Sequence, residues 1–98
     1  MTENTPSLKI KLEGSKKFLQ NADLKEADLE GADLKGAELG GADMRRANLK
    51  KIFLSEAKIA KANLSEANLT EANLSGADLN KSNLGGSNMQ QAYLRRAD

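Results

Sequence analysis

Large apolar residues recur at every fifth position through most of the chain, and a small residue precedes each by two positions. One such unit is Ala62-Asn63-Leu64-Ser65-Glu66, and the repeats run in a single frame from Ala22 to Asp98. An internal repeat this regular decides the architecture. The predicted core consists of the large residues Leu24, Leu29, Leu34, Leu39, Met44, Leu49, Leu54, Ile59, Leu64, Leu69, Leu74, Leu79, Leu84, Met89 and Leu94.

A period of five residues fits neither an α-helix nor a continuous strand. On a helix, each step of five residues turns by about 500°, so the large residues would spiral around the whole surface. On a strand, an odd spacing sends successive large residues to opposite faces. A short extended segment followed by a turn in every repeat places both the small and the large residue inside. We therefore predict an all-β coil that stacks on itself, a β-solenoid.

Glycine supports the predicted position of the turn. Five glycines lie two positions after a large residue, where a turn accepts residues with positive φ. These glycines are Gly31, Gly36, Gly41, Gly76 and Gly86.

The repeats resemble those of the pentapeptide-repeat family, whose signature is A(D/N)LXX in tandem. Residues 62–66 and 67–71 match it, and the resemblance covers about residues 18–98. It implies a right-handed quadrilateral β-helix with four repeats per square coil, and hence about four coils. It also implies that the Asp or Asn before each large residue points outward or sideways, where its side chain can bond to nearby backbone. The chain is similar to the short members common in cyanobacteria.

Four repeats per coil would align residues that are twenty positions apart. Opposite charges then fall in the same column, and each such pair contributes about 0.2–1 kcal/mol. Coincidence is the alternative, because 30% of the residues are charged. The columns are Glu26, Arg46 and Glu66; Glu38, Lys58 and Asp78; and Lys51 with Glu71.

The sequence divides into an N-terminal segment, residues 1–17, and the repeat domain, residues 18–98. Leu8, Ile10 and Leu12 alternate with charged or polar residues, as on a half-buried strand. We predict that this strand caps the N-terminal end of the solenoid. Phe18 is expected to help fill that end from within.

The repeat is broken most strongly where Ile52 replaces the small residue and Phe53 replaces Asp or Asn. Stacking by twenty residues puts Phe53 and Tyr93 on one face, with Asn73 between them. Two outward aromatic rings, together with Leu94, form a candidate interaction site. The alternative is that Phe53 is an exposed ring that packs against neighbouring columns.

At the C-terminal end the sequence offers no capping segment after the last repeat, so Leu84, Met89 and Leu94 are expected to stay uncovered. An uncovered coil is a template for another chain. We predict association end to end, either as a two-fold dimer or with another protein that presents a matching coil.

The composition argues against catalysis and cofactor binding. The chain has no His, Cys or Trp, which removes thiol nucleophiles, His bases and Cys/His zinc sites. Calcium is a weak alternative, because the acidic residues occur once per repeat on diverging sides. We therefore expect no enzyme, no catalytic residue, no metal and no cofactor.

The predicted function is that of a structural or protein-interaction module, with an unknown partner. The alternative is a DNA-mimicking inhibitor or protector of a type II topoisomerase such as gyrase, against which the net charge of +1 argues. The sequence has no apolar run of membrane-spanning length. We expect no membrane, nucleic-acid or small-molecule partner, and a cytoplasmic location.

Overall fold

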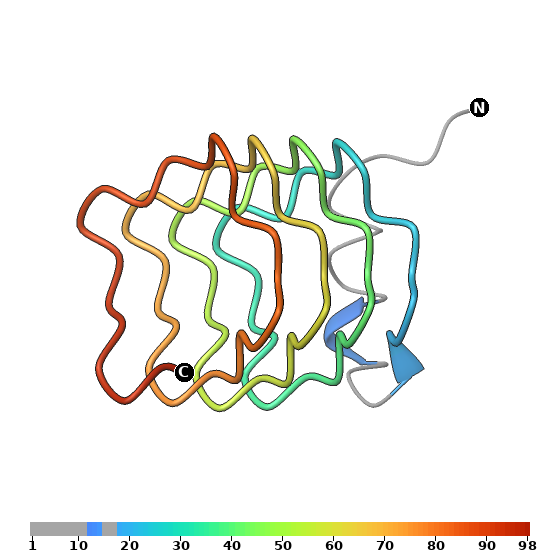
Figure 1. Cartoon of the computed structure of the whole chain (residues 1–98), viewed down its shortest axis with the longest axis horizontal. Helices are drawn as coiled ribbons and strands as arrows, with labels where there is room; N and C mark the ends of the chain where they lie inside the picture. The colour runs from blue at the N-terminus through green and yellow to red at the C-terminus, as the bar shows by residue number, and fades with distance from the viewer. Residues whose placement is uncertain (1–11, 15–17) are drawn as a thin grey trace.

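The computed structural model describes residues 12–14 and 18–98, and shows the repeats as a coil that stacks along one axis (Figure 1). Within this part of the chain, extended structure is limited to single bridge residues, each paired in parallel with the residue twenty positions further on. The chain therefore returns to the same side after four repeats. The bridges are Asp23↔Asp43, Asp28↔Asn48, Asp33↔Phe53, Glu38↔Lys58, Asp43↔Asn63, Asn48↔Asn68, Phe53↔Asn73, Lys58↔Asp78, Asn63↔Asn83, Asn68↔Asn88 and Asn73↔Tyr93.

Each repeat ends in a tight turn. In the first complete one, the amide of Ala27 donates to the carbonyl of Leu24 at 3.1 Å, and Glu26 has a φ of 59°. A positive φ at the third residue is the mark of a type II turn. The predicted glycines occupy this position, but non-glycine residues such as Arg46 and Lys51 adopt the same conformation. The fold therefore imposes the turn whether or not glycine is present.

The Asp and Asn side chains before the large residues hold the turns, as the family resemblance implied. The Asn63 Oδ1 accepts the amide of Ser65 at 3.0 Å. At the next repeat, the Asn68 Oδ1 accepts both the amide of Thr70 at 3.0 Å and its hydroxyl at 2.6 Å. These carboxamide oxygens are therefore committed to the backbone of their own repeat.

The core is a stack of large and small side chains that points into the coil. From Leu29 to Leu74 each large residue is at most 1% exposed. Ile52, which breaks the small position, is also buried. Leu79, Leu84 and Met89 are only partly buried, so the closed core ends before the last coil.

The N-terminal end differs from the sequence prediction. Leu12 and Glu13 are helical rather than extended, so the predicted strand is wrong at its last residue. Leu12 is nevertheless 8% exposed and belongs to the core. Leu8 and Ile10 lie outside the described residues, and the division at residue 17 stays a prediction. No helix in the described ranges is long and apolar enough to cross a membrane.

Phe18 does not fill the N-terminal end from within, since its side chain is 82% exposed. The repeat frame explains this result. Leu19 takes the inward position at 5% exposure, and Phe18 falls one position earlier, where side chains point out.

Candidate interaction site

The aromatic pair lies on one side of the coil, where the sequence placed it. Phe53 is 50% exposed and Tyr93 63% exposed, and both pair through their backbones with Asn73. Asn73 therefore separates the two rings, and its Oδ1 accepts the amide of Ser75 at 3.0 Å. The rings share a face but form no continuous apolar patch.

Leu94, the third predicted interaction residue, belongs to a different surface. It is 44% exposed and borders an open apolar hollow of about 350 Å³ at the C-terminal end of the coil. Partly buried core residues form most of the hollow, so it is the open top of the core rather than a separate cleft. The lining residues are Leu79, Ser82, Leu84, Met89, Leu94, Ala97 and Asp98.

Within the described residues, several backbone groups around the hollow have no hydrogen-bond partner. In the rest of the coil, the amide of a large residue donates to the next coil, as Leu64 does to the Asn83 carbonyl at 2.7 Å. Within residues 18–98, the amides of Leu84, Met89 and Leu94 have no such acceptor. The carbonyls of the small residues in the last coil are likewise unpaired in this range: Ser82, Ser87, Ala92 and Ala97.

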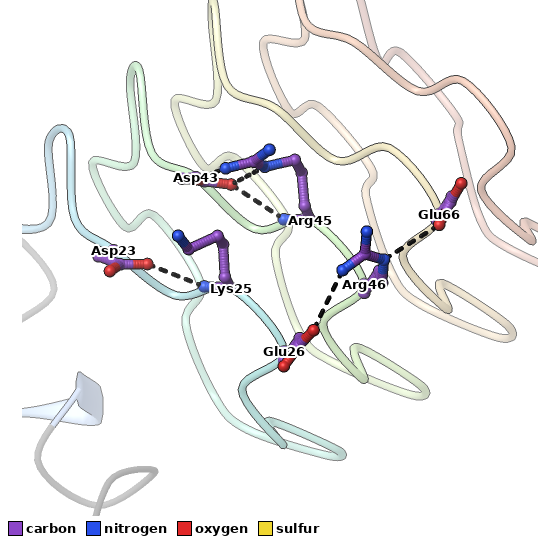
Figure 2. Close-up of polar contacts among 7 residues, drawn as sticks. All are labelled: Asp23, Lys25, Glu26, Asp43, Arg45, Arg46 and Glu66. Atoms are coloured by element: carbon purple, nitrogen blue, oxygen red, sulfur yellow. Dashed lines mark hydrogen bonds and ion pairs between the residues drawn. The ribbon is translucent and has the colours of Figure 1, made fainter.

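One predicted charge column is an ion-pair network. Arg46 lies between Glu26 and Glu66, with its Nη1 3.1 Å from the Glu26 Oε2 and its Nε 3.2 Å from the Glu66 Oε1 (Figure 2). These two contacts raise the pKa of Arg46. All three side chains are largely exposed, so the network stabilises the stack only modestly.

The other two columns form no ion pair within the described residues. Glu38, Lys58 and Asp78 are aligned by backbone bridges. Glu38 instead accepts a hydrogen bond from the Gln20 Nε2 at 2.9 Å. Alignment by twenty residues is therefore confirmed here, whereas the charge pairing is not.

Sequence reasoning missed the ion pair between Asp43 and Arg45, which lie two positions apart on one repeat. The Arg45 Nη2 is 2.8 Å from the Asp43 Oδ2, and its Nε donates to the Asp43 Oδ1 at 2.9 Å (Figure 2). This side-chain hydrogen bonding lowers the pKa of Asp43 from 3.8 to about 2. Its signal in the sequence is the Asp-Met-Arg spacing, which puts both side chains outside the coil.

A second hollow, of about 290 Å³, lies at the corner formed by Glu56, Ser75, Gly76, Arg95 and Arg96. It is open and holds charges of both signs. No group of three or more His, Cys, Asp or Glu that could hold a metal occurs in the part of the chain that the structure describes.

A comparison with protein-family models matches one family over most of the chain. A family model described as pentapeptide repeats matches eight copies, over residues 19–50, 54–86 and 77–98. The matched residues include all fifteen large residues of the repeats, from Leu24 to Leu94. A comparison with curated proteins gave no match.

Solved structures of pentapeptide repeat proteins resemble the chain. One, from Nostoc PCC 7120, is 30% identical with a TM-score of 0.77 over 93% of this chain and 72% of that chain. Another, from the thylakoid lumen of Arabidopsis thaliana, is 29% identical with a TM-score of 0.58 over 87% of this chain and 64% of that one. A third, from the cyanobacterium Cyanothece 51142, is 19% identical with a TM-score of 0.50, over 97% and 95% of the two chains, and supports the fold alone.

Proposed function

The chain belongs to the pentapeptide repeat family, and we propose that it is a non-catalytic interaction module that binds a second copy of itself end to end. In this proposal, the fold is a right-handed quadrilateral β-helix of about four coils. The contact surface, here called the open coil, consists of residues 79–98. The observation that carries the proposal is the open coil's uncovered apolar layer, bordered by unpaired backbone groups.

The exposed apolar layer of the open coil and its unpaired backbone groups both favour contact with another chain. Leu94 at 44% exposure is the most exposed of the fifteen predicted core residues. Burying apolar surface contributes about 25 cal/mol per Å². Unpaired amides and carbonyls at a sheet edge are a template for strand pairing. One contact would satisfy both needs at once.

The opposite end of the coil supports a closed pair rather than a filament. There, Leu19 and Leu24 are each 5% exposed, and Leu12 packs into the same cluster. Head-to-tail stacking needs an open core at both ends of the coil, and within the described residues the core is closed at the N-terminal end. A contact between two identical ends is isologous and stops at the dimer. Since its area is about the cross-section of one coil, we expect weak, concentration-dependent association.

The charge distribution disfavours the alternative of DNA mimicry, which needs a continuous negative face. Positive charges instead lie among the acidic ones, as Arg46 lies between Glu26 and Glu66. A location in the cytoplasm remains our prediction.

The test is light scattering of the chain over a wide concentration range, with Leu94→Glu as the variant. We expect the mean mass to rise from monomer toward dimer for the unchanged chain and to stay monomeric for the variant. Phe18→Glu is the matched control, because Phe18 is exposed at the covered end. Circular dichroism reports whether each variant folds. If the unchanged chain remains monomeric at millimolar concentration, the proposal is refuted.

A further inference from the structure

One corner of the coil keeps opposite charges apart instead of pairing them. The turn residues at this corner, each twenty positions from the next, are Gly36, Glu56, Gly76 and Arg96. In the column of Arg46, opposite charges lie on adjacent coils and pair at 3.1 and 3.2 Å (Figure 2). Here Gly76 lies between Glu56 and Arg96, so the two charged residues are two coils apart, about 9.6 Å along the axis.

Because Gly76 has no side chain, a hollow lies beside this column. Its volume is about 290 Å³, and its lining consists of Glu56, Ser75, Gly76, Arg95 and Arg96. The Glu56 carboxylate reaches over the glycine, since a Cβ built on Gly76 would lie 2.7 Å from the Glu56 Oε2. A side chain at residue 76 would therefore displace this carboxylate and fill part of the hollow.

The side chains around the hollow are available to a ligand. Within the described residues, Glu56, Arg95 and Arg96 form no ion pair. Ser75 bonds to Asn73 through its backbone amide, which leaves the Ser75 hydroxyl available. The hollow thus offers one carboxylate as acceptor, two guanidinium groups as donors and one hydroxyl.

These groups select a ligand by its charges. An ammonium group suits the Glu56 carboxylate, and carboxylates form bidentate pairs with guanidinium groups such as those of Arg95 and Arg96. The hollow carries one negative and two positive charges, so a ligand with one ammonium and two carboxylates would neutralise it. We infer that this corner binds a small amino dicarboxylate, which is the charge pattern of an acidic amino acid such as aspartate. This ligand departs from the sequence prediction of no small-molecule partner.

The size and openness of the hollow set the expected affinity. At about 290 Å³ it is just below the usual range for ligand pockets, about 300–1,000 Å³, and so suits a ligand of few atoms. Glu56, Arg95 and Arg96 are exposed, so water screens each ion pair with the ligand. We therefore expect a dissociation constant of about 1–10 mM for aspartate.

An NMR titration with three matched ligands tests the charge pattern. Aspartate carries both kinds of charge, succinate lacks the ammonium group, and putrescine lacks the carboxylates. Aspartate should shift the amide signals of Ser75 and Gly76 saturably and bind about two- to five-fold more tightly than succinate, whereas putrescine should not shift them. Equal affinity for aspartate and succinate, or shifts that do not saturate, overturns the inference.

Charge variants assign the contacts. Glu56→Gln should weaken aspartate binding about two- to five-fold but not succinate binding, because only aspartate has an ammonium group to pair with this carboxylate. Arg96→Gln should weaken both. Lys61→Gln is the matched control, because Lys61 is an exposed, unpaired cation within the described residues at the same turn position of another corner. An equal loss in Lys61→Gln would indicate general charge attraction and overturn the site.

A pair of glycine variants tests the hollow itself. Gly76 and Gly36 have φ of 71° and 72°, so an alanine at either position carries the same backbone cost. Only Gly76→Ala meets the Glu56 carboxylate, since a Cβ on Gly36 has nothing within 4 Å. Gly76→Ala should therefore weaken aspartate binding relative to Gly36→Ala, and equal affinity in the two variants overturns the hollow as the site. The titrations use dilute, monomeric chain, so their outcome is independent of end-to-end association.

Discussion

At the scale of the residue, the third position of each turn sets the local cost of the fold. Residues there have φ between 57° and 72°, whatever their type. A side chain in this left-handed conformation costs about 1–3 kcal/mol, whereas glycine adopts it without steric cost. The repeat tolerates the cost because the stacked coils fix the turn from above and below. Glycine at this position therefore raises the stability of the repeat but is not required for the fold.

Two glycine substitutions separate this backbone cost from packing. A Cβ on Gly31 meets open space, but Gly31 has a φ of 71°, so Gly31→Ala should destabilise by about 1 kcal/mol. Gly40 is not in the left-handed region, and its Cβ would make ordinary contact with the Ala60 carbonyl at 3.6 Å. Gly40→Ala should be neutral or stabilising by about 0.4–1 kcal/mol. Urea denaturation measures the change in unfolding free energy for both variants. Equal changes would contradict the assignment of Gly31, but not Gly40, to a turn position with positive φ.

The Asp43–Arg45 pair gives the molecule a defined pH response. Hydrogen bonding from Arg45 lowers the pKa of Asp43 to about 2, so its carboxylate stabilises the fold above pH ~4. That contribution is lost as pH falls through the folded pKa. In Arg45→Gln, we expect the pKa of Asp43 to return toward 3.8, and we expect the stability difference that this pair causes to shrink below pH 4 and to be lost below its folded pKa of about 2. Carbon-13 NMR titration of the Asp43 carboxyl measures the shift, and an unchanged pKa in the variant would contradict it.

At the scale of the repeat, inward and outward positions should respond differently to the same change. Leu64 is fully buried, so Leu64→Ala leaves a cavity and should destabilise by about 2–5 kcal/mol. Ser65, the next residue, uses its backbone amide rather than its hydroxyl to bond Asn63, so Ser65→Ala should be nearly neutral. Chemical denaturation compares them, and similar losses would reject the inward and outward assignment.

The period of five was enough to predict the repeat unit, because only one alternation of extended segment and turn puts every large residue inside. The number of sides required the family resemblance, since period five gives the length of a side alone. The N-terminal end was predicted poorly for two reasons. Leu12 lies outside the repeats, where short alternation does not distinguish a strand from a helical turn. The prediction for Phe18 ignored the repeat frame, in which Leu19 takes the inward position.

The candidate site was predictable only in outline. Tyr93 and Leu94 could be placed at the last coil from the repeat frame. Their separation into an outward ring and an open apolar layer required the structure, because exposure of Leu94 depends on what stacks above it. The Asp43–Arg45 pair was missed because a pairing within one repeat is chosen by side-chain conformation, not by the column register.

At the scale of the whole molecule, burial falls along the axis of the coil. Large core residues are 5% exposed or less from Leu19 through Leu74, Leu79, Leu84 and Met89 are only partly buried, and Leu94 is 44% exposed. Stability in a solenoid is approximately a sum of neighbouring contacts, so a coil with one neighbour is held less firmly than a coil with two. The open coil is therefore the part of the repeat domain whose order depends most on a second chain.

Hydrogen exchange of backbone amides tests this dependence at single residues. The Leu84 and Leu94 amides have no acceptor within the described chain, so we expect fast exchange in dilute solution. In the proposed end-to-end dimer these two amides lie at the contact surface, so their exchange should slow as concentration rises. The Gly86 amide is the internal control. It is also unpaired in the described chain but lies at a corner, where the dimer supplies no carbonyl, so it should exchange fast at every concentration.

The Leu64 amide, bonded to the Asn83 carbonyl at 2.7 Å, should stay protected from exchange at every concentration. Concentration-dependent protection of all three unpaired amides alike would indicate general aggregation and contradict the specific contact.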